Sequence, residues 1–271
     1  MLPLRTWVKR GINRVGRTFL PSVSKTGARC LLYHTIVPVE QPDPGQRTTP
    51  VRLFEQQMAF LAQREYRIIS AGELVQQIRA GIMPPEKTVC LTFDDGEASL
   101  HELAFPILQR YRFPFTIFLI AERQGTSPFL KWEEIRRMQA SGLAEFGCHG
   151  ASHRPLRGLP EGDLRHETAQ AKRRIEEEIR REVSLFAYPY GVWDNEAVAA
   201  VRRAGFRGSF TTIFGLNRPD VDPYRLKRSR VSWFDVPSQF ECLLAGACDW
   251  YAGLQHLQEA ASTSFRRVRI R

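Results

Sequence analysis

The chain has 271 residues, 43% of them hydrophobic and 25% charged, which suits a globular protein with a sizeable core. No uncharged apolar run reaches the roughly 18 residues that span a bilayer, and five cysteines without a Cys-x-x-Cys pair argue against a disulfide framework. The net charge of +10 lies in the tails, because residues 1–29 hold seven basic residues and no acid, and four arginines follow residue 265. These eleven charges exceed the total by one, so residues 30–265 sum to −1, which argues against a nucleic-acid-binding face on the body.

The N-terminal segment has the pattern of a basic amphipathic helix. At 100° per residue, five apolar residues share one narrow face and basic residues surround them: Leu4, Val8, Ile12, Val15 and Phe19. Such a helix either lies in an anionic membrane interface or packs on the body with its charges solvated, and both interpretations stay open. Because basic residues interrupt any secretory apolar run, we expect a cytoplasmic protein, peripheral on the inner membrane face under the first interpretation.

Along the body, short apolar runs alternate with helical patterns. Runs typical of strands cover 30–36, 66–70, 88–93, 115–120, 144–149, 184–190 and 208–214, with a weaker run at 225–231. Helical patterns cover 54–61, 74–81, 131–142, 161–182 and 193–204. This alternation predicts an α/β fold with a parallel sheet, either a (β/α) barrel or an open doubly wound sheet. We expect three regions: a basic extension over 1–29, one catalytic domain over 30–248 and a basic tail over 249–271.

Unusual polar residues gather where these strands end. Asp94 and Asp95 follow strand 88–93, His149 ends strand 144–149 with His153 four residues on, and Tyr190 and Gly191 end "FAYPYG". His34 lies near the end of the first strand. Because the carboxyl ends of parallel strands meet at one edge, the fold brings these side chains together.

A metal explains why two carboxylates stand side by side in "LTFDDG". Two imidazoles and one carboxylate make a site for a divalent transition metal with open positions, and the metal's charge relieves the repulsion between the two acids. The second carboxylate is then free to take a proton from a water that the metal activates. This is machinery for hydrolysing an amide, an ester or a similar bond.

Each feature alone has an ordinary interpretation. Asp-Asp-Gly after a strand is often a turn or a helix cap, His-x-x-x-His is often incidental, and "YPYG" is a common turn. Their occurrence together, each at a strand end, favours the catalytic interpretation.

The three motifs "TFDDG", "HGASH" and "FAYPYG" resemble those of the polysaccharide deacetylases, carbohydrate esterase family 4. The resemblance implies a distorted (β/α)7 barrel, with Asp94 as catalytic base and the turn at Pro189 and Tyr190 lining the acyl pocket. It also implies that one divalent metal ion, zinc in the simplest case, is held by three residues: Asp95, His149 and His153.

The chain departs from the family pattern at three places. Gly150 follows the first metal histidine where Ser or Thr is common, Phe186 replaces an arginine that orients the base, and no late Leu-x-His motif supplies an acid. The opening "LLYHTI" is similar to the poly-N-acetylglucosamine deacetylase branch, where an N-terminal histidine is the acid. By that resemblance His34 is the acid, and its alternative is a core-facing histidine with a satisfied hydrogen bond.

The sequence therefore predicts a metal-dependent hydrolase that removes the acetyl group from an N-acetylated sugar, polymeric or lipid-linked. Removal of a formyl or O-acetyl group is an alternative within the same class. An inactive glycan- or lipid-binding module on the same barrel is the alternative from a different class. The partners expected are a carbohydrate and, through the N-terminal helix, an anionic membrane surface, with no nucleic acid.

Overall fold

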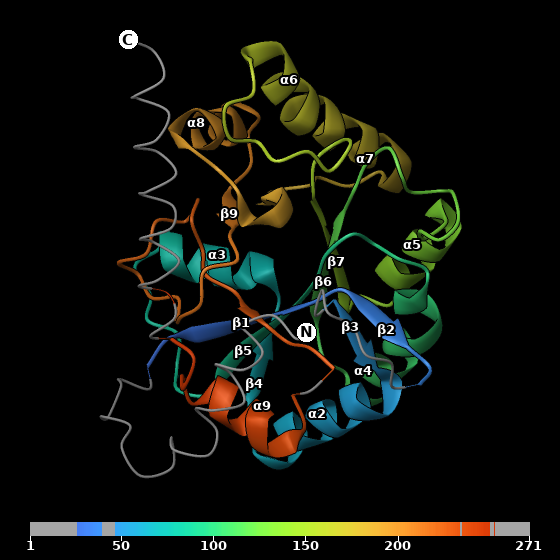
Figure 1. Ribbon diagram of the computed structural model, residues 1–271, viewed down its shortest axis with the longest axis vertical. Helices are drawn as coiled ribbons and strands as arrows, with labels where there is room; N and C mark the ends of the chain where they lie inside the picture. The colour runs from blue at the N-terminus through green and yellow to red at the C-terminus, as the bar shows by residue number, and fades with distance from the viewer. Residues whose placement is uncertain (1–25, 40–46, 234, 250–251, 253–271) are drawn as a thin grey trace, which may run out of the picture.

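The computed structural model describes residues 26–39, 47–233, 235–249 and 252 (Figure 1). The amphipathic helix predicted over residues 1–20 lies outside the described residues, as does nearly all of the predicted tail over 249–271. Within the described part, no helix combines the length and the apolar character needed to cross a membrane.

Seven parallel strands follow one another around the main sheet in the order β10-β1-β5-β6-β7-β8-β9, and β4 (Arg67–Ile69) pairs with β5 beside them. Their bounds are β1 Ala28–Tyr33, β5 Thr88–Phe93, β6 Phe115–Leu119, β7 Ala144–Cys148, β8 Leu185–Ala187, β9 Gly208–Phe210 and β10 Ser229–Arg230. The last strand pairs with the first through Leu31 and Ser229, and Phe210 of β9 bridges to Leu226 just before β10. The sheet therefore curls into the distorted (β/α)7-type barrel that the resemblance implied, and the open doubly wound alternative is wrong.

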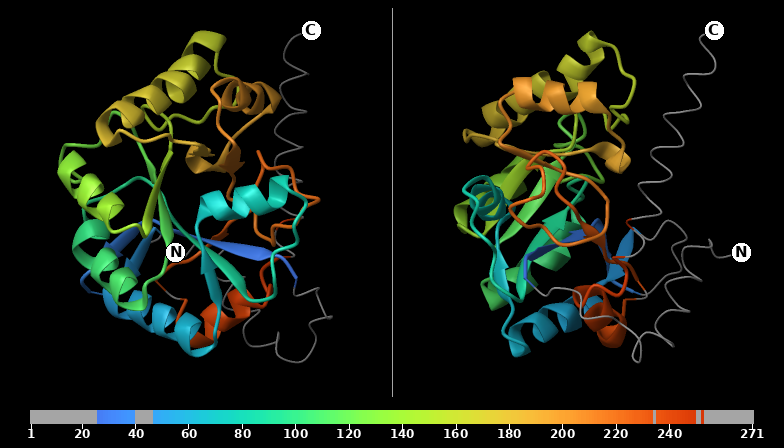
Figure 2. Two further views of the ribbon diagram at one scale, coloured as in Figure 1. Left: turned by 180° about the vertical axis from the view of Figure 1, so that it is seen from behind. Right: turned by 90° about the vertical axis from the view of Figure 1, so that its left-hand side faces the viewer.

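Helices lie around the outside of the strands in the three views of the molecule (Figures 1 and 2). Their bounds are α2 Val51–Gln63, α3 Ala71–Arg79, α4 Phe105–Tyr111, α5 Trp132–Ala140, α6 Glu161–Arg165, α7 Ala171–Ile179, α8 Asn195–Arg203 and α9 Pro237–Leu244. A two-stranded sheet of β2 (Thr35–Val37) and β3 (Thr48–Pro50) follows β1. The elements α4 and α9 have no counterpart among the predicted helices.

Helix formation follows local signals. In α2 the buried residues recur at helical spacing, so one face packs on the strands while the other meets solvent: Leu53, Phe54, Gln57, Met58 and Leu61. Helix α8 begins after Asp194, whose carboxylate accepts the Ala197 N–H and so caps the first turn. The helix predicted over 161–182 forms as one helical run from Glu161 to Ile179, in which a π-helical turn at His166–Gln170 lies between α6 and α7.

The core has two layers, one between strands and helices and one inside the barrel. Every residue of β5 is buried, as expected for a parallel strand that is covered on both faces. Val89, Leu91 and Phe93 join the outer layer, whereas Cys90 joins the inner one. This alternation continues past the strand end, so Asp94 falls on the inner side at the rim of the barrel.

Candidate active site

Three metal-ligating side chains meet at the carboxyl ends of β5 and β7. Ligand atoms of Asp95, His149 and His153 all lie within 4.8 Å of one another, and all three residues are buried. The Asp95 Oδ1 atom is 3.7 Å from His149 Nε2 and 3.3 Å from His153 Nε2. The structure thus brings together the three residues that the sequence predicted as ligands.

The orientation of the His149 ring is fixed by a hydrogen bond from its Nδ1 atom. Its Nδ1 lies 2.7 Å from the Ala187 carbonyl oxygen, which can only accept, so Nδ1 carries the proton and Nε2 offers its lone pair to the cluster. The His149 backbone N–H donates to the Leu119 carbonyl at 2.7 Å, which extends the β6–β7 pairing to the strand end. The ligand therefore rests on two neighbouring strands.

The cluster fits a divalent cation. The Oδ1 atom of Asp95 is buried without a hydrogen-bond partner among the described residues, while Oδ2 accepts from Arg47. Burial lowers the pKa of His153 to about 4, so its imidazole is neutral at pH 7, the form that binds metals. Ligand atoms about 2.0–2.2 Å from a tetrahedral ion stand roughly 3.4 Å apart, close to the spacing found between Asp95 and the two imidazoles. This donor set suits zinc and other divalent transition metals.

Asp94 is held by a buried arginine that the sequence analysis did not identify. Arg228 donates from Nη1 to Asp94 Oδ1 at 2.6 Å and from Nη2 to Oδ2 at 2.9 Å, and its side chain is fully buried. It reaches Asp94 from the segment before β10, whereas Phe186, at the position where the family often has an arginine, packs against Phe206 in the core. A buried arginine therefore contacts Asp94 from a different place in the chain.

The Arg228 pair sets the charge of Asp94. Burial by itself raises the pKa of this carboxyl, but the guanidinium of Arg228 and the nearby His149 outweigh it and hold the pKa below its usual range. The Asp94 Oδ2 atom lies 3.6 Å from His149 Nε2, so an ionised carboxylate stands directly beside the metal cluster.

His34 follows β1 at the rim of the barrel, where the carbonyl of the preceding Tyr33 accepts the backbone N–H of Asp94 at 3.0 Å. Asp94 and Asp95 both act on its charge, yet burial dominates and lowers the pKa of His34 to about 3. Its Nδ1 is buried without a hydrogen-bond partner among the described residues, so the alternative of a core histidine with every hydrogen bond satisfied does not hold for that atom. The imidazole is neutral at pH 7 in the metal-free protein.

The predicted acyl-pocket turn lies beside the histidines. Pro189 is buried, whereas the Tyr190 side chain is 57% exposed, and its ring centroid lies 4.6 Å from that of His153. Tyr190 adopts φ of 58°, a left-handed conformation that non-glycine residues rarely take and that often marks functional turns. The turn therefore borders the cluster on its open side.

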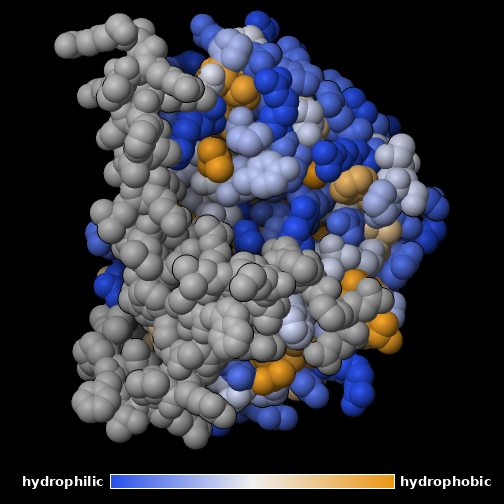
Figure 3. All heavy atoms as spheres, viewed as in Figure 1, coloured by the Kyte–Doolittle hydropathy of each residue, from blue (hydrophilic) through white to orange (hydrophobic). Residues whose placement is uncertain are grey.

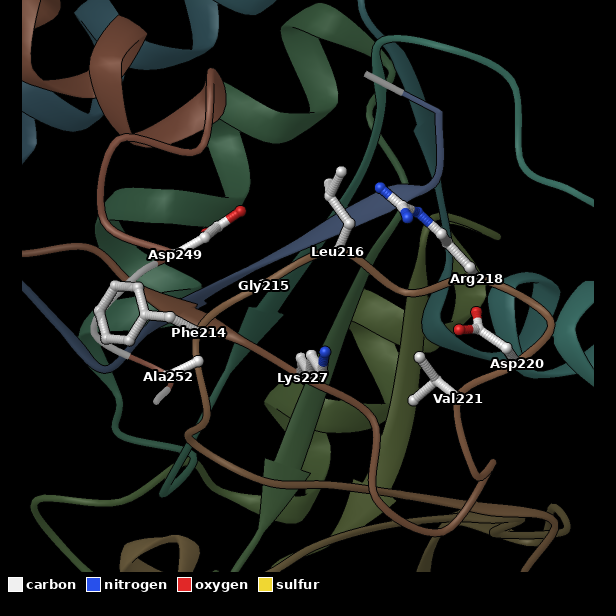
Figure 4. Close-up of a pocket in the computed structure, with 9 residues that line it drawn as sticks. All are labelled: Phe214, Gly215, Leu216, Arg218, Asp220, Val221, Lys227, Asp249 and Ala252. Atoms are coloured by element: carbon white, nitrogen blue, oxygen red, sulfur yellow. The ribbon is translucent and has the colours of Figure 1, made fainter. Parts of the chain in front are cut away.

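A separate cavity of about 200 Å³ lies near the amino end of β1 (Figure 4). Its walls include Leu216, Lys227 and Asp249, and Asp249 pairs with Arg29 near the start of β1. It is therefore at the opposite end of β1 from His34, and none of its lining residues belongs to the cluster. On the face shown in Figure 3 the coloured surface is mostly hydrophilic, with hydrophobic residues in small separate groups.

Comparison with known proteins agrees with this site. Residues 82–209 match the family model described as polysaccharide deacetylase, which confirms the resemblance of the motifs. It is 28% identical over 202 residues to YxkH, a candidate polysaccharide deacetylase of Bacillus subtilis, covering 74% of this chain and 70% of that protein.

Two further relatives extend the likeness. The poly-beta-1,6-N-acetyl-D-glucosamine N-deacetylase of Staphylococcus epidermidis is 25% identical over 195 residues, which cover 66% of this chain and 66% of that protein. The structure of IcaB from Ammonifex degensii superposes with a TM-score of 0.72 at 29% identity, covering 82% of this chain and 97% of that one. The likeness thus extends well beyond the residues that the family model matches.

Proposed function

We propose that this protein is a metal-dependent hydrolase that removes the acetyl group from N-acetylated sugars of a polysaccharide or a lipid-linked saccharide. The observation that carries the proposal is the juxtaposition of the Asp95–His149–His153 cluster with Asp94, an ionised carboxylate that Arg228 holds 3.6 Å from His149. The Staphylococcus epidermidis relative, named as an N-deacetylase of poly-beta-1,6-N-acetyl-D-glucosamine, supports the choice of bond.

In the proposed mechanism the three-residue cluster holds one divalent ion, which we propose to be zinc. Bound there, the ion would polarise the acyl carbonyl and lower the pKa of the attacking water. Asp94 takes the proton from that water, and Arg228 keeps the carboxylate ionised and correctly turned for this step. Pro189 and Tyr190 border the acyl group, and the Tyr190 backbone N–H supplies a donor for the developing oxyanion.

His34 is proposed as the general acid. An amine leaves poorly as an anion, so a proton must reach the nitrogen as the bond breaks. Because the pKa of His34 is lowered to about 3, the imidazole is neutral in the resting protein and must gain its proton during the reaction. The adjacent Asp94, which receives a proton from water, is a suitable source.

The test is acetate release from N-acetylhexosamine oligomers and lipid-linked saccharides, with and without chelator. The wild-type protein should release acetate, lose the activity on chelation and regain it with zinc or cobalt. Asp94→Asn should bind metal as the wild type does and lose roughly 10²-fold or more in kcat, because the general base is gone. Near-normal turnover by Asp94→Asn would exclude this mechanism.

Removal of an O-acetyl group is the second candidate, and the neutral state of His34 favours it. An alkoxide leaves more readily than an amine anion, so an ester depends less on a proton donor. Comparing kcat/KM for matched O-acetyl and N-acetyl sugars distinguishes the two substrates.

We further propose that residues 30–248 form the catalytic domain and that the basic segment 1–29 attaches it to an anionic membrane surface. The charge pattern of that segment supports attachment, since its seven basic residues have no acidic counterpart. Attachment would hold the barrel near lipid-linked substrates.

A further inference from the structure

The loop between the two metal-binding histidines is held by a carboxylate from a different element. Glu167 is fully buried, and its Oε2 accepts the backbone N–H groups of Ala151 at 2.8 Å and Ser152 at 3.1 Å. Its Oε1 accepts the Ser152 hydroxyl. All three donors lie in the short stretch between His149 and His153.

The other side of this loop is fixed as well. The carbonyls of Gly150 and Ala151 accept the backbone N–H groups of Ala121 and Glu122, each at 3.0 Å. Donors and acceptors of the loop are therefore paired on opposite sides, with the strand β6 continuation on one and Glu167 on the other. A buried donor left without its partner would favour a different loop conformation.

The conformation that these bonds maintain is an unusual one. Gly150 has φ of 84° and His153 has φ of 70°, and a non-glycine residue keeps such a value only where its surroundings determine it. A Cβ at position 150 would stand 2.7 Å from Glu167 Oε2, so a side chain there would displace the carboxylate from its present place. The Glu167 carboxylate occupies the space beside the loop that a side chain at 150 would need.

The π-helical turn at His166–Gln170 provides the position of Glu167. In Figure 1, α6 and α7 form one long helical run at the top of the molecule, and this turn lies between them. A π-turn adds a residue to the helical repeat and is frequent at functional sites. Glu167 is the second residue of the turn and projects into the barrel rim.

We propose that Glu167 is a positioning residue for the metal cluster, which fixes the loop 150–152 and thereby the placement of His153 relative to His149. The inference rests on the proposed metal site. Glu167 does not touch the metal or substrate; it acts through the loop, and residues that orient metal ligands in this way typically change metal affinity by 10–100-fold when removed.

Two variants of Glu167 distinguish the effect of its side-chain length from the effect of its charge. Glu167→Gln keeps the length, and its carbonyl can still accept both backbone N–H groups while its amide donates to the Ser152 oxygen. Glu167→Asp keeps the charge but is one methylene too short to reach the loop. If Glu167 acts by fixing the loop 150–152, Glu167→Gln should retain metal affinity within about fivefold. In Glu167→Asp and Glu167→Ala the metal affinity should fall by 10–100-fold.

A matched control is available at the other end of β7. The carboxylate of Glu145 also accepts a backbone N–H, from Gly72 at 2.8 Å, and a hydroxyl, from Thr116 at 2.9 Å. Glu145→Ala should therefore lower thermal stability without changing metal affinity. It shows what the loss of a structural carboxylate does by itself.

The experiment is calorimetric titration of the chelator-stripped full chain with Co²⁺ and Zn²⁺, together with the visible spectrum of the Co²⁺ form, which reports ligand geometry. The inference is wrong if folded Glu167→Ala binds Co²⁺ within threefold of the wild type with an unchanged spectrum, or if Glu145→Ala weakens binding equally. It is also wrong if Glu167→Asp binds better than Glu167→Gln, a comparison that remains usable should Glu167→Ala not fold. Failure of the wild-type chain to bind either ion would instead refute the proposed metal site.

Discussion

The guanidinium of Arg228 donates two hydrogen bonds, of 2.6 and 2.9 Å, to the carboxylate of Asp94, and both side chains are buried. Two parallel bonds fix the rotation of the carboxylate as well as its charge, which a lysine cannot do. The arrangement leaves Asp94 ionised beside His149 in surroundings that would otherwise favour its protonated form.

Replacing Arg228 should therefore impair the base before it impairs metal binding. In Arg228→Lys we expect kcat/KM to fall by roughly 10²-fold, and the acid limb of its pH profile to move to higher pH, because burial then raises the pKa of Asp94 with less opposition. Removing the cation altogether, as in Arg228→Met, leaves a buried charge unpaired and should cost about 3–5 kcal/mol of folding free energy. Arg29→Lys is the control, since Arg29 makes a similar paired contact with Asp249 far from the site. An unchanged pH profile in Arg228→Lys would contradict the role assigned to the pair.

Each metal ligand should be needed for metal retention. Asp95→Ala, His149→Ala and His153→Ala should each lose bound metal and activity together, as measured by elemental analysis of the purified proteins and by acetate release. His166→Ala is the control, because the His166 side chain is partly exposed and pairs with Glu122, which is outside the three-residue cluster. Stoichiometric metal in all three ligand variants would show that the site is elsewhere.

The contribution of His34 should depend on the leaving group. His34→Gln should keep its metal and lose about 10²-fold in kcat on an N-acetyl sugar, where the departing amine needs a proton. On an activated aryl acetate, whose leaving group needs none, the same variant should lose less than tenfold. Equal losses on both substrates would remove His34 from the acid role.

Buried neutral histidines should make the metal-free protein sensitive to acid. The pKa of His34 is lowered to about 3 and that of His153 to about 4, whereas both titrate near 6.5 in the unfolded chain. Between these values the unfolded state binds more protons, so each histidine should cost about 1.4 kcal/mol per pH unit as the pH falls from about 6.5 toward 4. Denaturant unfolding of the chelated protein at several pH values measures this slope, and His34→Gln should show a shallower one. A slope that His34→Gln leaves unchanged would mean that the imidazole is solvated.

Residues 1–20 should bind the protein to anionic membranes. Five basic residues near an anionic surface give an upper bound of roughly 5 kcal/mol before ordering costs, enough for reversible attachment. In liposome sedimentation the full chain should bind anionic vesicles and release at high salt, and deletion of residues 1–20 should abolish binding. If the truncated protein binds equally well, the segment only packs on the body.

The sequence predicted the strands best where the chain is buried on both faces. Strand β5 has the bounds expected from its run, because no charged residue interrupts Thr88–Phe93 and every residue of it is buried. The predicted runs at 184–190 and 208–214 shortened to three residues each, since pairing ends where the chain turns into the site. The site residues at 94, 95, 149 and 153 could be predicted because strand ends converge in any parallel fold.

Arg228 and Glu167 could not be found in this way. Arg228 lies in the run "RLKRSR", which has the composition of a solvated basic segment. Only its spacing of two residues from the apolar Leu226 indicates that both side chains share one face of a strand and that this face is buried. Glu167 lies in a long charged helical pattern, where the π-turn that directs it inward has no local signature. Both are buried charges whose partners are distant in sequence, so their burial follows from tertiary structure alone.

The pairing of β1 with β10 also has a consequence for the order of assembly. A chain emerging from the ribosome makes His34, Asp94 and both metal-binding histidines long before residue 228, so Asp94 has no counterion until the barrel is nearly complete. Arg29 likewise has no carboxylate partner until Asp249, 220 residues later in the chain, has been synthesised. A nascent chain that stops before residue 228 therefore holds Asp94, Asp95, His149 and His153 without the arginine that pairs with Asp94, so we expect activity only after synthesis has passed this residue.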